Sequence, residues 1–396
     1  MTDTPHQIKC SACGTSPVNH NLLLFSDILD ATLGKINASV FYFTNTDKWE
    51  KFSIFLEKVL FEIFAFLKIV TFSKDVEKAL TGRSKLIWEE ANKRGIKMEQ
   101  VKIFGKPVEF YRAIINGKKR YFQSLPIPPW LQQSGYKWLD DKFKLYQVLS
   151  KNNIKVPKAY KISNLSQAKK AFENLSKPVI IKPQNGSRGR HTTTNINTEE
   201  ELINALNLSR QITLFTVMQE HLFGSVCRAT VINNKLVGFF RATPPQIIGD
   251  GIHTIQELID DKNKNRNKKI SDVNINDDLI DFIKRQNYTL DSILEKDKII
   301  DLSAKTGRFY GGYTEEMLPK IHPKMHDIFS RAGSLIKAPI AGFDLIIKDP
   351  TKDPDTERWG IIECNSLPFI DLHYFALEGN PVNLAENIWD LWKKEN

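Results

Sequence analysis

One stretch near the C-terminus constrains the fold most strongly, because it places a carboxylate inside an apolar run. Two short apolar runs, Ala341–Ile347 and Trp359–Ile362, flank a turn rich in Pro, Asp and Lys. Short apolar runs separated by turn residues are typical of a β-hairpin, here with a long loop. The sequence therefore predicts two paired strands in this region.

Three metal-capable side chains belong to this hairpin. Asp344 lies within the first run, and Glu363 and Asn365 follow the second. Strand residues two apart point to the same side, so Glu363 and Asn365 share a face, and Asp344 faces them if the strands pair. Two carboxylates and an amide oxygen favour Mg²⁺, held together with phosphate oxygens. The alternative, a surface hairpin with scattered acids, leaves the cost of burying Asp344 unexplained.

The composition fits a globular protein of two or three domains, with 396 residues and a net charge of +10. A basic chain attracts anionic partners, either nucleic acid or phosphorylated small molecules. No stripe of arginines interleaved with aromatic residues stands out, so nucleic acid is disfavoured. We expect the lysines to be spread over a solvated surface, with Lys262–Lys269 as a flexible loop.

The four cysteines are too few for a disulfide framework. Cys10 and Cys13 form a single CxxC, and a structural zinc site needs four ligands. Free thiols in a reducing cytoplasm are therefore favoured. A zinc site that uses His6 or His20 is the alternative.

The N-terminus lacks the features of a signal peptide, which favours a cytoplasmic protein. Charged residues interrupt the apolar segment Phe52–Phe72, so it predicts a buried or amphipathic helix instead of a membrane span.

Residues 1–130 are expected to form an N-terminal domain. Helices are predicted over Trp49–Phe72 and Asp75–Arg94, and strands follow, with an Asn116-Gly117 hairpin turn between the last two. The prolines of Leu125–Trp130 end this domain. The expected strands are Val101–Phe104, Val108–Ile115 and Arg120–Ser124.

Residues 131–396 mix helices with hairpin-connected strands, which favours an α+β fold over a doubly wound parallel sheet. The predicted helices are Lys142–Asn152, Ser166–Leu175, Glu199–Leu208, Thr254–Asp261, Asp277–Gln286, Leu290–Glu295, His322–Ala338 and Asn383–Lys394. The predicted strands before the acidic hairpin are Pro178–Lys182, Thr213–Gln219, Cys227–Ile232 and Lys235–Ala242.

A polar loop, Gln184–Thr194, follows the apolar strand that ends in Lys182. Its glycines let the backbone approach a ligand closely, and its backbone N–H groups can bind phosphate. A plain turn explains the loop equally well, but a lysine inside the fold needs an anionic partner to stay charged. The alternative is a lysine at the strand end that reaches water.

Arg228 and Arg241 interrupt or end the apolar runs of two successive strands. Their forked guanidinium groups suit a phosphoryl or carboxylate group.

These features together resemble the ATP-grasp carboxylate–amine ligases, most closely the ATP-grasp region of the cyanophycin synthetases and more loosely the glutathione synthetases. The resemblance covers Tyr136 to the C-terminus. It rests on the segments VIIKPQNGSRGRHTTTN, GFFRATPPQIIGDGIHTIQELI, QNYTLDSI, AGFDLII and IIECNSLPFIDLH. It implies an ATP-grasp fold with a lid subdomain at about 150–225 and a metal-binding subdomain at 226–396, which carries an insert at about 255–310.

The resemblance also implies a role for each site residue. Arg228 and Arg241 would stabilise the transferred phosphoryl group and the tetrahedral intermediate. The metal ligands would be Asp344, Glu363 and Asn365, with Mg²⁺ or Mn²⁺ as the ion. The residues implied in ATP binding are Lys142, Lys182, Gly186, Ser187, Arg188, Gly189, Gln219, Glu220, His221 and Leu222.

Four departures from the family pattern bear on the nucleotide, the acceptor substrate and the product. Gln219 stands where family members often carry Glu, and Val226 cannot accept the ribose hydrogen bonds that a Glu nearby provides. The glycine-containing segment TGRFYGGYTEE replaces the STGG run of the cyanophycin branch. The chain stops at Asn396, without the Mur-ligase-like half, so two-step synthesis of an Asp–Arg polymer is not expected.

The function that the resemblance implies is an ATP- and Mg²⁺-dependent ligase. It would activate an amino acid or peptide carboxylate as an acyl phosphate and join it to an amine. The N-terminal domain would complete the substrate cleft, and analogy with related enzymes implies a homo-oligomer. The alternatives are a ligase that modifies a protein or ribosomal peptide, and a non-catalytic nucleotide- or nucleic-acid-binding module.

Overall fold

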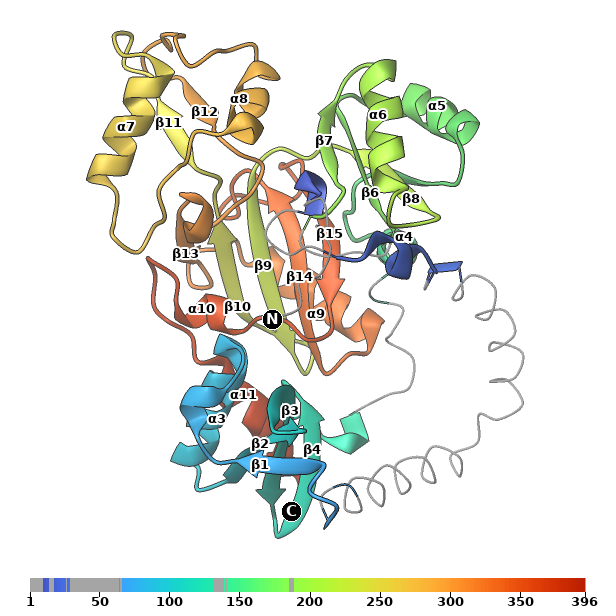
Figure 1. Ribbon diagram of the computed structural model, residues 1–396, viewed down its shortest axis with the longest axis vertical. Helices are drawn as coiled ribbons and strands as arrows, with labels where there is room; N and C mark the ends of the chain where they lie inside the picture. The colour runs from blue at the N-terminus through green and yellow to red at the C-terminus, as the bar shows by residue number, and fades with distance from the viewer. Residues whose placement is uncertain are drawn as a thin grey trace, which may run out of the picture. The chain divides into compact units, whose positions relative to one another are not determined.

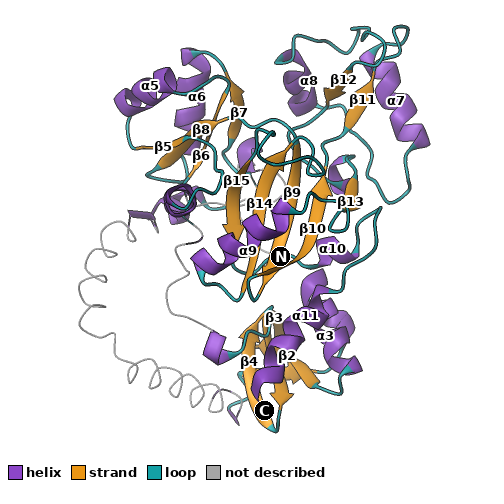
Figure 2. Cartoon of the chain, turned by 180° about the vertical axis from the view of Figure 1, so that it is seen from behind, coloured by secondary structure: helices purple, strands orange, loops and turns teal. Residues whose placement is uncertain are grey.

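The computed structural model describes residues 10–13, 18–25, 27–28, 64, 66–131, 139, 141–184 and 189–395. The chain divides into two units, each built from separate stretches of sequence. Figures 1 and 2 show the helices and strands that belong to them. The first unit contains Met1–Pro128, Ala159–Gln219 and Ile388–Asn396, and the second contains Pro129–Lys158 and Glu220–Asn387. Both combine helices with antiparallel strand pairs, which confirms the predicted α+β class.

A four-stranded sheet in the first unit has the order β1-β2-β3-β4 and is antiparallel throughout. Its strands are β1 (Val70–Ser73), β2 (Lys97–Ile103), β3 (Lys106–Ile115) and β4 (Lys118–Gln123). The predicted turn between β3 and β4 is confirmed, because Asn116 and Gly117 have φ angles of 49° and 73°. Such paired positive values match the twist of the flanking strands.

Helix α3 (Gly82–Lys93) packs against β2 and begins after Thr81, whose side chain accepts the N–H of Ser84. The C-terminal helices α11 (Leu384–Asp390) and η6 (Leu391–Glu395) reach the same sheet. The indole of Trp389 donates to the carbonyl of Ile87, and that of Trp392 to Pro126. The C-terminus therefore helps to close the core around the N-terminal sheet.

The helix predicted over Trp49–Phe72 is wrong at its C-terminal end, and residues 49–63 lie outside the described part of the chain. Val70–Ser73 forms β1, which pairs with β2. β-branched Val70 and Thr71 favour a strand, and the ladder satisfies their backbone groups. The helix predicted over Asp75–Arg94 is split into a 3₁₀ turn, η2 (Val76–Lys78), and α3.

A second four-stranded sheet in the first unit has the order β5-β8-β6-β7, with helices α5 and α6. Asn164 caps α5 and Thr198 caps α6, the latter in a capping box with Glu201. The apolar core lies between these helices and the sheet and includes Ile181, Leu202 and Met218. The elements are β5 (Ala159–Ile162), α5 (Leu165–Asn174), β6 (Val179–Pro183), β7 (Thr193–Ile196), α6 (Glu199–Ser209) and β8 (Thr216–Glu220).

The second unit is built on a five-stranded antiparallel sheet with the order β13-β10-β9-β14-β15. Helix α9 packs on one face of this sheet (Figure 2), and α4 lies against β15. Phe239, Phe329 and Phe343 are fully buried between α9 and the strands. The elements are α4 (Lys142–Lys151), β9 (Ser225–Ile232), β10 (Lys235–Ala242), β13 (Thr314–Glu316), α9 (Lys324–Ile336), β14 (Ile340–Ile347) and β15 (Gly360–Asn365).

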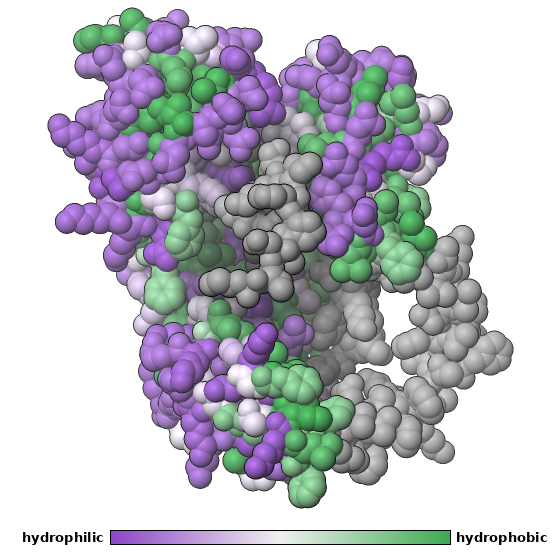
Figure 3. Space-filling view, in the orientation of Figure 1, coloured by the Kyte–Doolittle hydropathy of each residue, from purple (hydrophilic) through white to green (hydrophobic). Residues whose placement is uncertain are grey.

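An insert between β10 and β13 has an apolar cluster of its own. It contains β11 (Gln246–Ile248), α7 (Ile255–Asn265), α8 (Asp277–Lys284), β12 (Ile299–Asp301) and η5 (Arg308–Tyr310). The visible surface of this insert is largely hydrophilic (Figure 3). Two predictions are wrong here. Leu290–Glu295 is not helical, because Thr254 and Ile293 form an isolated β-bridge. Lys262–Lys269 is not simply a loop, because its first four residues complete α7.

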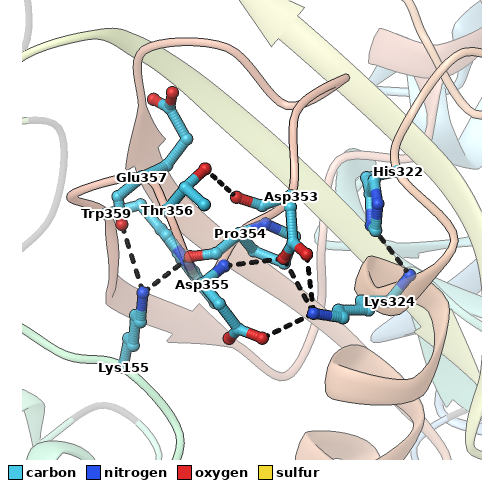
Figure 4. A network of polar contacts seen from close by, with 9 residues as sticks. All are labelled: Lys155, His322, Lys324, Asp353, Pro354, Asp355, Thr356, Glu357 and Trp359. Carbon is cyan, nitrogen blue, oxygen red and sulfur yellow. Dashed lines mark hydrogen bonds and ion pairs between the residues drawn. The ribbon is translucent and has the colours of Figure 1, made fainter.

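The long loop between β14 and β15 is held by two lysines from other parts of the chain (Figure 4). Lys324, at the start of α9, forms ion pairs with Asp353 and Asp355 at 2.7 and 2.6 Å. Lys155 donates to the carbonyl oxygens of Pro354 and Glu357 at 2.6 and 3.1 Å. These contacts fix the loop that joins the two strands of the acidic hairpin. None of the helices in the described part of the chain is long and apolar enough to span a membrane.

Candidate active site

The predicted acidic hairpin is confirmed, and its register aligns three charged residues in one row across the sheet. Arg228 of β9 is the partner of Asp344 in β14, and Asp344 is the partner of Glu363 in β15. Residues opposite each other in an antiparallel sheet project from the same face. The row is therefore a continuous charged strip on the face that bears Arg228.

Arg228 holds Asp344 at two points. The guanidinium Nη2 lies 2.8 Å from Oδ2, and Nε donates to Oδ1. Burial lowers the pKa of Arg228, but the negative charge of Asp344 outweighs that effect, and the pKa is raised. The buried Nη1 has no hydrogen-bond partner among the residues that the structure describes. This guanidinium therefore keeps a donor available beside the carboxylates.

Glycine at position 342 makes room for this guanidinium. A Cβ atom there would lie 3.2 Å from Nη1 of Arg228 and 2.6 Å from Cβ of Pro368. A larger residue would push the arginine away from Asp344. The close packing at Gly342 thus fixes the direction of the Arg228 side chain.

A β-bulge interrupts the pairing of β15 next to Glu363. The register shifts between Asp344, which is opposite Glu363, and Leu345, which is opposite Ile361, and the carbonyl of Ile362 accepts the hydroxyl of Tyr146 at 2.7 Å. Asn365 donates through Nδ2 to Oδ2 of Asp344 at 3.2 Å. Cys364 is only 1% exposed and packs in the core, as alternation along the strand predicts. Bulges of this kind re-aim side chains at sites.

Lys142 brings a second cation to the same strip. It is the first residue of α4, is 6% exposed, and its Nζ lies 3.9 Å from Oε2 of Glu363. The two carboxylates of Asp344 and Glu363 are thus balanced by two cations, Arg228 and Lys142. Side-chain oxygens of this kind suit Mg²⁺, so the donor set fits the ion. Because the local charge already balances, the strip suits Mg²⁺ bound with an anionic ligand better than the free cation.

The structure does not bring Arg241 onto this face. Arg241 of β10 is the partner of Cys227, which lies in the core under α9, and strand alternation directs it away from the side of Arg228. Its guanidinium pairs with Glu315 of β13. Burial raises the pKa of Glu315, but Lys320 and Arg241 outweigh burial and lower it.

The other predicted ATP-binding residues belong to the first unit and to the segment that follows it. Lys182 in β6 is 8% exposed, and Gln219 in β8 is 1% exposed. Gly189 has a φ of +67°, a conformation that only glycine adopts readily. Gly186, Ser187 and Arg188 lie outside the described residues.

The predicted hinge, Glu220–Leu222, begins where β8 ends. Leu222 is 4% exposed, and the carboxylate of Glu220 lies 3.6 Å from Nη2 of Arg358. Burial lowers the pKa of His221 to about 4. This imidazole is therefore neutral at physiological pH.

Sequence reasoning missed a buried polar network beside the strip. His373, in the short helix α10 (Asp371–Tyr374), contacts Glu316 at 2.6 Å through Nδ1 and Thr230 at 2.7 Å through Nε2. Glu316 also accepts the backbone N–H of Phe239 at 2.9 Å. Thr230 lies two residues beyond Arg228 on the same face of β9, so this network supports the strand that carries the arginine. The adjacent acids in the segment TEE were the available signal.

Comparison with known proteins agrees with this geometry. The model of the ATP-grasp domain family matches residues 139–366, which is more than half of the 396 residues. The chain therefore belongs to the ATP-grasp family. The matched range includes all three residues predicted to hold the metal.

Among curated relatives, the cyanophycin synthetase of Synechocystis sp. is 32% identical over 264 residues, which cover 63% of this chain and 30% of that protein. The glutathione biosynthesis bifunctional protein GshAB of Clostridium perfringens is 27% identical over 320 residues, covering 76% of this chain and 40% of that protein. The crystal structure of a bifunctional glutathione synthetase from Pasteurella multocida has a TM-score of 0.50 at 21% identity, covering 79% of this chain and 44% of that one. The chain thus spans less than half the length of these proteins, and the structural match confirms the ATP-grasp fold.

Proposed function

We propose that this protein is an ATP- and Mg²⁺-dependent ligase that joins a carboxylate to an amine through an acyl phosphate. The observation that carries the proposal is the in-register row of Arg228, Asp344 and Glu363, with Lys142 and Asn365 beside it. Membership of the ATP-grasp family supports it. The substrates we propose are an amino acid or peptide carboxylate and a small-molecule or peptide amine.

In this scheme Asp344, Glu363 and Asn365 hold the metal, which neutralises phosphate charge when it is bound. Lys142 and Lys182 bind phosphate oxygens of ATP, and Gln219 with the backbone of 220–222 binds the adenine. The segment from Gly186 to Gly189 covers the phosphates. We also propose the subdomains predicted from the sequence, a lid at about 150–225 and a metal-binding subdomain at 226–396 with its insert at about 255–310. Residues 1–130 would complete the substrate cleft.

The cationic side chains of the protein stabilise the negative charge that develops during the reaction. The substrate carboxylate attacks the γ-phosphoryl group of ATP, ADP leaves, and the amine then displaces phosphate from the acyl carbon. Arg228, with a donor beyond its bonds to Asp344, can stabilise the oxyanion that forms at that carbon. The sequence also predicts that Arg241 stabilises this oxyanion. Because Arg241 lies on the other face of the sheet, we expect its replacement to lower the rate less than that of Arg228.

The test is the release of ADP and phosphate by the full chain with pooled carboxylates and amines, followed by the mass of the product. Asp344→Asn and Glu363→Gln are expected to lower the rate by about 10²–10³, as the loss of one transition-state contact typically does. Asp353→Asn, in the exposed hairpin loop, is the matched control and should keep the wild-type rate. Wild-type turnover by both site variants would refute the assignment.

A further inference from the structure

Two cysteines and two histidines from distant parts of the first unit converge on one point. Cys10, Cys13, His20 and His191 each offer a ligand atom, and these four atoms all lie within 4.8 Å of one another. The segment with the cysteines lies beside the residues that precede β7 (Figure 1). The sequence favoured free thiols because one CxxC supplies only two of the four ligands of a zinc site. His191 lies 178 residues from Cys13, so spacing along the chain does not reveal it as a ligand.

The separations are those of a tetrahedral site. The Sγ of Cys13 lies 3.2 Å from Nε2 of His20 and 3.5 Å from Nε2 of His191, and the Sγ of Cys10 lies 3.7 Å from the latter. Zinc bonded to sulfur at about 2.3 Å and to nitrogen at about 2.0–2.1 Å has sulfur–nitrogen edges of about 3.6 Å. Both cysteines are free thiols and not a disulfide. We propose that these four residues bind a structural Zn²⁺ ion.

The surroundings of His191 favour metal binding through Nε2. Its Nδ1 lies 2.8 Å from the carbonyl oxygen of Leu208, and a carbonyl can only accept, so Nδ1 carries the proton. Nε2 then presents its lone pair to the two sulfur atoms. An outer hydrogen bond that fixes the tautomer in this way accompanies most metal-binding histidines.

The backbone fixes the cysteines against the same histidine. The N–H of Cys13 donates to the carbonyl of Cys10 in the turn η1 (Ser11–Cys13), which brings the two thiols together. The N–H of His191 donates to the carbonyl of Ala12 at 3.1 Å. Cys13 is 4% exposed and His191 is 1% exposed. Two of the four ligands are therefore shielded from water, and Cys10 and His20 are half-buried.

The ligand atoms favour zinc over magnesium. Two sulfur and two nitrogen ligands in tetrahedral array favour zinc, and magnesium prefers oxygen. Binding releases the two thiol protons, and two thiolates neutralise the charge of Zn²⁺. The ion would join Cys10, Cys13 and His20 to His191, which precedes the edge strand β7 of the β5-β8-β6-β7 sheet, and so strengthen the backbone contact between Ala12 and His191. This site is separate from the acidic strip in the second unit.

The experiment measures zinc by mass spectrometry in the full chain purified without added metal, with no ATP or substrate present. About one zinc per chain is expected. Cys13→Ser and His20→Gln should each weaken binding at least about tenfold. His326→Ala, an exposed histidine on α9, should retain the metal. Wild-type protein without zinc, or with zinc that both ligand variants retain, would overturn the proposal.

Cobalt substitution keeps the test decisive if a ligand variant fails to fold. Wild-type chain stripped of metal and refilled with Co²⁺ should show thiolate-to-cobalt charge transfer and the strong visible bands of a tetrahedral site. A spectrum without thiolate bands, or a mass that shows a Cys10–Cys13 disulfide, would contradict the site. Neither result depends on ligase turnover, so failure here leaves the proposed function standing.

Discussion

Arg228 and Asp344 are joined by a two-point ion pair between adjacent strands, with Nη2 and Oδ2 2.8 Å apart. The same carboxylate accepts from Asn365 and stands opposite Glu363. Arg228 therefore orients Asp344, a proposed metal ligand, and its Nη1 remains available to donate to a substrate. The site depends on this coupling between a cation and a carboxylate.

Replacing Arg228 with lysine should lower ligase turnover by about 10²–10³, although the charge remains. Lysine offers a point charge and cannot reproduce the forked contact with Asp344. The measurement is ADP release, compared in a cycle of Arg228→Lys, Asp344→Asn and the double variant. Because the two residues share one contact, the increase in activation free energy of the double variant should be smaller than the sum of the increases in the two single variants. Strict additivity would show that the pair has no functional coupling.

The buried Glu316 should be important for stability. Glu316→Ala leaves the N–H of Phe239 and the imidazole of His373 without their acceptor in a fully buried site. We expect a loss of about 3 kcal/mol in the free energy of unfolding. Urea denaturation measures it, with Glu295→Ala on the exposed surface as the control, expected within about 0.5 kcal/mol of wild type. Equal midpoints for the two variants would contradict this account.

Acid should destabilise the protein in part through Glu315. Lys320 and Arg241 lower the pKa of this carboxyl below its usual 4.5 in the folded state. A lowered folded pKa adds stability above the unfolded value, and that stability is lost as the pH falls through the folded pKa. The urea midpoint of the wild type should therefore drop below pH 4.5 more steeply than that of Glu315→Gln. Parallel pH profiles would rule out this contribution.

The two lysines that hold the hairpin loop should differ in effect. Lys324 forms exposed ion pairs with Asp353 and Asp355, and Lys324→Met should cost less than about 1 kcal/mol. Lys155 donates to two backbone carbonyls, and Lys155→Met should cost more, because the carbonyl of Glu357 loses this donor and that of Pro354 keeps only the indole of Trp359. Thermal unfolding of the two variants compares them. A larger loss for Lys324→Met would reverse this ranking.

Local patterns in the sequence were enough for most elements. The Asn116-Gly117 turn, the helix that begins at Lys142 and the hairpin around Asp344 all formed where short-range signals placed them. The failures came where non-local pairing prevailed. Val70–Ser73 became a strand because β2 was available to pair, and residues 290–295 were drawn into a β-bridge with Thr254.

The sequence by itself determined which residue types were available: acids inside apolar runs, paired arginines, and one CxxC. Tertiary structure decided which of them meet. Strand register put Arg228 beside Asp344 and turned Arg241 to the opposite face, because alternation fixes a side only once the pairing is known. Chain folding likewise brought His191 to Cys10 and Cys13, a contact across 178 or more residues that spacing along the chain cannot reveal.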